Sequence, residues 1–429
     1  MKVPRSRRAP FCGATLFIVA ILLVVVSTAY ASSVRYNNLY GFHGSPDASY
    51  PSGGLIADAS GNLYGTTQSG GLNATCFCGT VFQFAPPATP GGTWTETVLH
   101  SFGVSACDGE GLQATLLLDK LGNLYGTTTG GSCGAGTVFE LSPPAVAGQS
   151  WTETILYSFT GTRLHGGEPG PTLAMDASGN LYGTTPVGGI GNSCVYITLD
   201  CGVVFELHAP KTNGAAWTEQ AVYSFGMPGD SLYGPCHLVM RGTSFYGTAR
   251  TIGGGGAVFQ LARSHGIFTR TVLYEFPSDG FQLLDVLTFD SAGNIFGNAN
   301  AVSSVCPAGC GGVFELSPPG TLGDPWTETT LYSFTGRQDG YSPTGRLVLD
   351  KSGNLYGATE LGVSNAGAVF ELSPPATPGD PWAETTLHEF GSVQDQSGNP
   401  WSGLLFLKGR FYGTTWARNG TIFSLTIVP

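Results

Sequence analysis

The sequence Gly-Asn-Leu-Tyr-Gly-Thr-Thr occurs three times, at residues 61–67, 122–128 and 179–185. Looser copies follow, so the glycine of a Leu-Tyr-Gly marker falls at residues 65, 126, 183, 247, 297, 357 and 413, at spacings of 50 to 64 residues. Internal repeats of about this size are typical of solenoids and β-propellers, whose blades usually take about 40 to 50 residues. The whole chain is therefore expected to be one repeated structural unit.

Each unit contains four strand-like segments, which we name A to D. In the second unit they cover residues 113–119, 123–128, 136–141 and 151–159, bounded by Gly, Pro, Asn or Ser. Between segments A and B lies an Asp-x-x-Gly stretch, which predicts a tight turn with the aspartate bonded to local amides. No segment shows helical periodicity over the length that a helix needs. The sequence therefore predicts an all-β fold of four-stranded antiparallel blades.

The two ends of the repeat region indicate a closed ring. The last unit supplies segments A, B and C at residues 402–407, 411–415 and 421–427 but no segment D. Residues 34–42 read as an isolated segment D, and closure would remove exposed sheet edges. We therefore expect a seven-bladed propeller in which 34–42 is the outer strand of blade 7, with blades at about 52–102, 111–159, 170–225, 235–276, 281–334, 344–390 and 401–427 plus 34–42.

The first 31 residues have the pattern of a secretory signal peptide. A basic start is followed by an apolar run of 16 residues, 11–26, and by Ala29-Tyr30-Ala31, which offers a small-residue cleavage site. The run is shorter than the roughly 20 residues of a spanning helix, so an uncleaved anchor is the less favoured alternative. We expect residues 32–429 to form one propeller, secreted or periplasmic after cleavage, with no membrane span.

Composition narrows the possible partners. Charged residues make up 11% of the chain, the net charge is −11, and no Lys/Arg cluster follows the leader. Nucleic acid and anionic membrane surfaces are therefore not expected as partners. We expect a monomer whose partner is a polysaccharide or an extracellular protein.

The recurring pattern D-x-x-G-N-L-Y-G-T-T, then G-T-V-F-E-L, then W-T-E-T-V-L-Y-S-F resembles the GloVer-type tandem repeat of secreted bacterial proteins. The resemblance covers residues 34–427 and implies export and a propeller-like repeat, but no activity or cofactor. The fourth and seventh units depart from the pattern, and Met240 and Phe406 are expected to replace the turn aspartate there.

Most acids that could look catalytic are repeat positions. The first residues of the Asp-x-x-Gly turns are expected to be structural; they are Asp58, Asp119, Asp176, Asp290 and Asp350. The glutamates that follow the tryptophan of segment D (96, 153, 219, 328 and 384) recur symmetrically, which indicates packing between blades. The seven histidines show no zinc-binding spacing, and the G-x-S-x-G match at 130–134 lacks a strand-to-helix elbow. We predict no catalytic set, no metal site and no cofactor.

Nine cysteines follow the leader, and an exported chain permits disulfides. Seven lie in B–C loops and two, Cys107 and Cys236, in D–A loops, so all nine are expected at one face. We predict local bridges Cys194–Cys201 and Cys306–Cys310. Cys76 and Cys78 are expected to reach Cys107 and Cys133 because a C-x-C bridge would be strained, which leaves Cys236 without a partner.

The face that carries these loops is the predicted binding face. Its candidate residues are Asp108, Glu110, Glu168, Asp230, Asp279, Asp339 and Trp401. Polar loops with nearby aromatic rings favour a carbohydrate ligand, and an extracellular protein is the next alternative. The leading hypothesis is a secreted, non-enzymatic binding module. A carbohydrate-active lyase or glycosidase that uses Glu110 or Glu168 is the second hypothesis, and a structural envelope component is the third.

Overall fold

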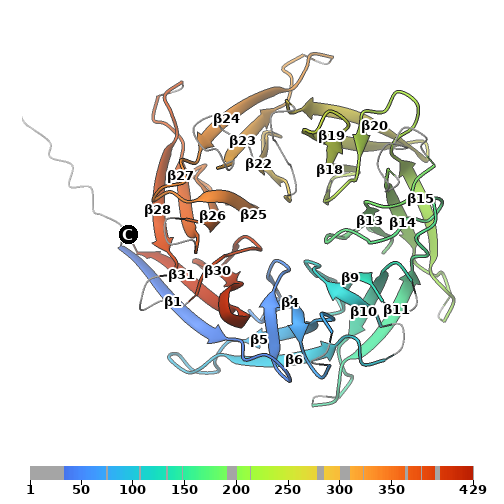
Figure 1. The fold of residues 1–429 in the computed structure, drawn as a ribbon, viewed down its shortest axis with the longest axis vertical. Coiled ribbons are helices and arrows are strands. Elements are labelled where there is room, and N and C mark those ends of the chain that lie inside the picture. Colours follow the sequence, from blue (N-terminus) through green and yellow to red (C-terminus); the bar gives the residue numbers. More distant parts are fainter. Residues whose placement is uncertain are drawn as a thin grey trace, which may run out of the picture.

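The computed structural model describes residues 33–73, 76–105, 108–131, 134–146, 148–190, 201–212, 214–277, 285–299, 310–321, 323–362, 366–377, 379–391 and 397–428. Within them the chain forms seven antiparallel sheets that follow one another around a ring, which confirms the seven-bladed propeller (Figure 1). The predicted signal peptide lies outside the described residues. In the described part of the chain, no helix has the length and apolarity to cross a membrane.

Blades 1 to 3 follow the chain from its start. Blade 1 contains β2 (Ala48–Pro51), β3 (Ile56–Ala57), β4 (Leu63–Gly70), β5 (Thr80–Ala85) and β6 (Thr95–Ser101). Blade 2 contains β7 (Glu110–Leu112), β8 (Leu117–Leu118), β9 (Leu124–Gly130), β10 (Thr137–Ser142) and β11 (Thr152–Ser158). Blade 3 contains β12 (Ala174–Met175), β13 (Leu181–Thr185), β14 (Val203–His208) and β15 (Thr218–Ser224).

Blades 4 to 7 complete the ring. Blade 4 contains β16 (Leu232–Tyr233), β17 (Leu238–Arg241), β18 (Ser244–Thr251), β19 (Gly256–Ser264) and β20 (Ile267–Glu275). Blade 5 contains β21 (Thr288–Phe289), β22 (Ile295–Ala299), β23 (Gly312–Ser317) and β24 (Thr327–Ser333). Blade 6 contains β25 (Tyr341–Leu349), β26 (Leu355–Leu361), β27 (Ala368–Ser373) and β28 (Ala383–Glu389). Blade 7 contains β29 (Leu405–Leu407), β30 (Arg410–Thr415), the short 3-10 turn η1 (Ala417–Asn419), β31 (Thr421–Val428) and β1 (Ser33–Gly41).

The ring closes through the N-terminal strand, as predicted. β1 pairs antiparallel with β31 from Ser33 opposite Val428 to Gly41 opposite Thr421 (Figure 1). Just beyond β1, Phe42 packs against Phe82 of blade 1 with 5.2 Å between ring centres. The closing blade is therefore joined to its neighbour by the same contact as every other blade.

Phenylalanine pairs join all seven blades. The last residue of each segment D packs on the phenylalanine of segment C in the next blade, with ring centres 4.9 to 5.3 Å apart, mostly edge to face, a favoured aromatic geometry. The seven pairs are Phe42–Phe82, Phe102–Phe139, Phe159–Phe205, Phe225–Phe259, Phe276–Phe314, Phe334–Phe370 and Phe390–Phe423.

The marker glycine is explained by the same phenylalanines. A Cβ placed on Gly126 would lie 2.5 Å from Cζ of Phe139 on the paired strand, well inside van der Waals contact. The other six units give 2.4 to 2.6 Å for the equivalent pair. Glycine therefore recurs because the tip of each phenylalanine ring occupies the space that a Cβ would take.

The Asp-x-x-Gly turns are structural, as expected. Asp58 accepts hydrogen bonds from the amides of Gly61 and Asn62 at 2.8 and 2.9 Å, and from the side chains of Asn62 and Tyr64. The four equivalent aspartates bond their own turns in the same way.

The register corrects two expected positions. Met240 and Phe406 pair with Phe245 and Phe411, as Ala57 pairs with Leu63, so Arg241 and Leu407 occupy the turn-aspartate position instead. Both turns are one residue shorter than the Asp-x-x-Gly turns. Counting back from the marker glycine therefore places the turn-aspartate position one residue too early.

Segment A is not the continuous strand that we expected at 113–119. β7 and β8 pair separately with β9, and residues 113–116 between them bond to the adjacent blades. The carbonyl of Ala114 accepts the hydroxyl of Thr66 at 2.8 Å, and the amide of Thr115 donates to Pro171 at 2.9 Å. The inner wall of the ring is thus held partly by hydrogen bonds from blade to blade.

Candidate functional site

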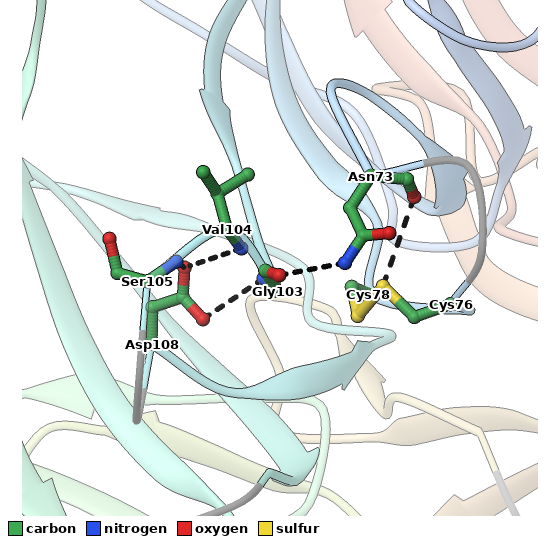
Figure 2. Close-up of a disulfide and its surroundings, with 7 residues drawn as sticks. All are labelled: Asn73, Cys76, Cys78, Gly103, Val104, Ser105 and Asp108. Atoms are coloured by element: carbon green, nitrogen blue, oxygen red, sulfur yellow. Dashed lines mark hydrogen bonds between the residues drawn. A yellow bond between two sulfur atoms is a disulfide. The ribbon is translucent and has the colours of Figure 1, made fainter.

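Three predicted binding acids are buried and organise their own loops. The Asp108 carboxylate accepts three backbone amides at 2.9 to 3.2 Å, from Gly103, Val104 and Ser105 (Figure 2). Asp230 and Asp339 are buried too and accept amides of their D–A loops. In the described structure these carboxylates stabilise their own loops by accepting backbone amides. A ligand-binding role for them stays a prediction.

The other predicted residues are separated from one another. Glu110 begins β7 and is exposed, while Glu168 is exposed with its amide bonded to Ala135 at 2.7 Å. Glu168 borders a small cavity of about 250 Å³ that includes Gln113 and His237. Trp401 is 46% exposed and borders the central cavity. Asp279 lies outside the described residues.

The disulfide pattern differs from the expected one. Cys76 and Cys78 bond to each other, and not to Cys107 or Cys133, which lie outside the described residues (Figure 2). Their Cα atoms are 5.2 Å apart, within the usual range for a disulfide, so one intervening residue suffices in this loop. Cys201 and Cys310 are each disulfide-bonded, and their predicted partners Cys194 and Cys306 are not among the described residues. Cys236 is a free thiol.

A cavity of about 760 Å³ occupies the centre of the ring and is lined by the inner segments of all seven blades. Near the A–B turns its wall is apolar, with Ile56, Leu117, Met175, Met240 and Leu405. Near the D–A loops the wall is polar, with Ser52, Gln113, Thr344 and Trp401. Concave sites with a few polar groups on an apolar wall are the usual form of a ligand site.

The repeat symmetry breaks in this wall. Each inner segment contains a recurrent leucine, and the residue before it is Gly54, Thr115, Thr172, His237, Val286, Arg346 or Gly403. The residue two before it is Gly53, Ala114, Pro171, Cys236, Asp285, Gly345 or Ser402. Ionisable side chains at these positions thus occur in blades 4, 5 and 6 only.

The sequence analysis did not identify His237, Asp285 and Arg346 as site residues. The signal lay in comparing the seven units position by position along segment A, where departures from the repeat mark residues that the fold does not require. The candidates chosen from the sequence were instead acids of the loop face, such as Asp108 and Asp339.

Asp285 is a half-buried acid that lines the channel. Its carboxylate accepts the amide of Gly345 at 3.1 Å and the side-chain amide of Asn298 at 3.3 Å. Burial raises the pKa of Asp285 to about 7, and these two hydrogen bonds offset only part of that effect. The group can therefore hold or release a proton near neutral pH, as an acid or base in a site must.

His237 lines the same cavity in the neighbouring blade. Burial lowers its pKa to about 4, so the imidazole is neutral at physiological pH. Its Nδ1 atom is buried and finds no hydrogen-bond partner among the described residues. A ligand hydroxyl is one group that could satisfy this nitrogen.

Arg346 provides a positive charge in the channel. Its side chain makes no hydrogen bond or ion pair with the described residues, and a guanidinium remains protonated even where burial lowers its pKa. The backbone of Arg346 bridges to Gly403, and Thr344 donates its hydroxyl to the carbonyl of Trp401 at 2.9 Å. The fold thus brings the inner segments carrying a guanidinium and an exposed indole together at one end of the channel.

The architecture is shared with solved propellers of different activities. A polysaccharide lyase of family PL25, an ulvan lyase bound to -[GlcA(1-4)Rha3S]-, aligns with a TM-score of 0.53 at 10% identity over 92% of this chain and 96% of its own. The polysaccharide lyase Uly1 gives 0.50 at 12% identity over 94% of both chains. Puromycin hydrolase gives 0.53 at 12% identity over 86% of this chain and 50% of its own. At these identities the likeness shows the fold alone.

The chain is a seven-bladed repeat propeller with an asymmetric channel. No curated protein sequence matches it. Its residues 24–197 match the family of the Gloeobacter/Verrucomicrobia repeat, which confirms the resemblance seen in the sequence over that region.

Proposed function

We propose that the protein binds an acidic carbohydrate at the D–A end of its central channel. The observation that carries the proposal is the guanidinium of Arg346, which lies in a ligand-sized cavity without an acidic partner among the described residues. The protein as a whole has a net charge of −11, and Asp285 and Glu360 line the same cavity, where Arg346 is the one cationic side chain among the described lining residues.

The chemistry around Arg346 suits a sugar acid. A guanidinium binds a carboxylate or sulfate through two parallel hydrogen bonds. Trp401, on the adjoining inner segment, offers an exposed ring face, and Gln113, Ser342 and Thr344 offer groups that bond sugar hydroxyls. Two of the propellers with similar folds are polysaccharide lyases, one of them bound to an acidic sugar chain, which supports a carbohydrate ligand.

A thermal-shift panel tests this proposal. Oxidised protein is mixed with polyglucuronate, polygalacturonate, a sulfated glycan and neutral dextran. A ligand at a hundred times its Kd should add about 2.7 kcal/mol to the free energy of unfolding. We expect a rise in the unfolding midpoint with an acidic glycan and none with dextran. A rise with dextran as large as with the acidic chains, or no rise with any of them, would contradict the proposal.

A second candidate function is a lyase that cleaves such a chain. It is favoured by Asp285, whose pKa is raised to about 7, and by neutral His237, because both line the cavity that contains Arg346. In a β-elimination a base takes the proton next to the carboxylate, the C–O bond of the leaving sugar breaks, a C=C bond forms, and the leaving oxygen gains a proton.

Turnover separates the two functions. Elimination produces an unsaturated sugar acid that absorbs ultraviolet light, so the reaction is followed directly with the glycan that gave the thermal shift. Absorbance that rises with wild type and not with Asp285→Asn would favour the lyase. A stable complex with no rise in absorbance would leave the protein a binding module.

A further inference from the structure

We propose that His100, Asp108 and Glu153 bind a divalent transition-metal ion, with Zn²⁺ the best match, at the interface of blades 1 and 2. One ligand atom from each residue, an imidazole nitrogen and two carboxylate oxygens, lies within 4.8 Å of the others. Nitrogen and carboxylate oxygen are ordinary Zn²⁺ ligands, and three protein ligands leave a position for water. None of the three residues lines the central cavity, so this site is separate from the glycan site.

The equivalent interfaces show what is special about this one. At three other interfaces the tyrosine of segment D donates a hydrogen bond to an aspartate of the following D–A loop. Tyr40 donates to Asp47 at 3.0 Å, and Tyr332 donates to Asp339 at 3.1 Å. In blade 1 the tyrosine is replaced by His100, which exchanges a phenol donor for a nitrogen that can bind a metal.

A positive charge already occupies this place at another interface. Between blades 3 and 4 the repeat glutamate is replaced by Arg270, whose guanidinium lies 3.0 Å from the Asp230 carboxylate. The fold therefore tolerates a cation between the D–A loop acid and the outer strand of the next blade. At the interface of blades 1 and 2, a bound metal ion would neutralise the loop acid as the Arg270 guanidinium does between blades 3 and 4.

Two atoms of the cluster lack partners. Nε2 of His100 and Oε1 of Glu153 are buried, and neither makes a hydrogen bond in the described structure. Nε2 lies 3.6 Å from Oε2 of Glu153, too far for a hydrogen bond. The same oxygen is unpaired in Glu96 and Glu219, so the unpaired nitrogen distinguishes this interface. Buried polar atoms normally have partners, and a metal ion would serve both.

The cluster lies near the surface and is partly fixed in place. The side chains of His100 and Glu153 are 20% and 14% exposed, although their unpaired atoms are buried. Asp108 is held by three loop amides, and Gly103 of that loop accepts a hydrogen bond from Asn73, beside the Cys76–Cys78 disulfide (Figure 2). Two Zn²⁺ ligands at about 2.2 Å lie at most about 4.4 Å apart, so small side-chain rotations suffice to close the site.

Calorimetric titration of chelator-treated, oxidised protein with ZnCl₂ tests the proposal. We expect one site with micromolar or tighter affinity in the wild type. His100→Tyr installs the residue found at five equivalent positions, so it should fold normally and bind Zn²⁺ at least 100-fold more weakly. His388→Tyr is the matched control, because His388 stacks on Tyr36 at 3.8 Å between ring centres and belongs to no cluster of metal-ligand type among the described residues. It should bind as the wild type does.

Further variants cover the remaining outcomes. Glu153→Gln should weaken binding as His100→Tyr does, with folding checked by the unfolding midpoint of each variant. Cys236→Ser should leave the affinity unchanged, which excludes the free thiol as the ligand. No binding by the wild type, or equal binding by His100→Tyr, would overturn the proposal. Neither result bears on the glycan site, which is tested without metal.

Discussion

The interfaces between blades and the wall of the central channel are made by the same seven repeats, but they vary in different ways. At the interfaces, seven phenylalanine pairs have ring centres 4.9 to 5.3 Å apart. Along the channel, equivalent positions change from glycine and threonine to His237, Asp285 and Arg346. Residues that the ring needs recur, and residues that differ from blade to blade are free to serve a ligand.

The largest effect on stability is expected where the repeat is most uniform. Gly126→Ala places a Cβ 2.5 Å from Phe139, and the ring cannot retreat because it is fully buried. We expect a loss of about 3 kcal/mol in the free energy of unfolding, measured by chemical denaturation. Gly320→Ala is the control, because nothing lies within 4 Å of its Cβ position and its φ is ordinary. Equal stability of the two variants would contradict the packing explanation.

A smaller loss is expected in the Asp-x-x-Gly turns. Asp119→Ala removes four hydrogen bonds, to the amides of Leu121 and Asn123 and to two side chains. Loss of a comparable cap costs about 1 to 2 kcal/mol. Lys120→Ala in the same turn, an exposed residue, should change the free energy of unfolding little. If Asp119→Ala were as stable as Lys120→Ala, the turn aspartates would need another explanation.

The buried glutamates of segment D should make stability depend on pH. Burial, with Asp47 nearby and Tyr40 facing both acids, raises the pKa of Glu96 from 4.5 to about 7. The native state therefore holds a proton that the unfolded chain releases, so this contribution is full below pH 4.5 and is lost as the pH rises through 7.

Glu96→Gln removes this contribution. Relative to the wild type, the variant should gain about 1 kcal/mol between pH 4.5 and pH 8, after allowance for solvent screening. Denaturation of both proteins at a series of pH values measures the difference. A difference that stays constant with pH would show that Glu96 is ionised in the native state.

The smallest effect on stability is expected in the channel. Arg346 makes no side-chain hydrogen bond or ion pair with the described residues, so Arg346→Gln should change the free energy of unfolding by less than about 0.5 kcal/mol. The unfolding midpoint of the variant, measured beside that of Arg35→Gln on the exposed outer strand, checks this. A large loss would make Arg346 a structural residue and weaken the contrast with the interfaces.

The fold was predictable because the same pattern of strands and turns recurs in seven units of the sequence. The marker glycines, the turn aspartates and the isolated segment D at 34–42 each led to the correct element. The errors arose where local geometry decides: a two-residue hairpin turn moved Arg241 into the place expected for Met240, and Cys76 reached Cys78 directly.

The channel residues could not be identified in the same way. Asp285, His237 and Arg346 are far apart in sequence and share no motif, and only the closed ring brings their blades around one cavity. The loop acids Asp108, Asp230 and Asp339 were chosen because they lie at the loop face, but the amides that they accept become visible only in the folded loops.

The most direct test of the account is the affinity of one acidic glycan, chosen from the thermal-shift panel, for wild type, Arg346→Gln and Arg35→Gln by isothermal calorimetry. Loss of a charge-assisted contact of about 1.5 to 3 kcal/mol corresponds to a Kd roughly 10- to 100-fold higher. We predict this loss for Arg346→Gln alone, with all three unfolding midpoints equal. Equal affinity of Arg346→Gln and the wild type would contradict the claim that the asymmetric channel is the binding site.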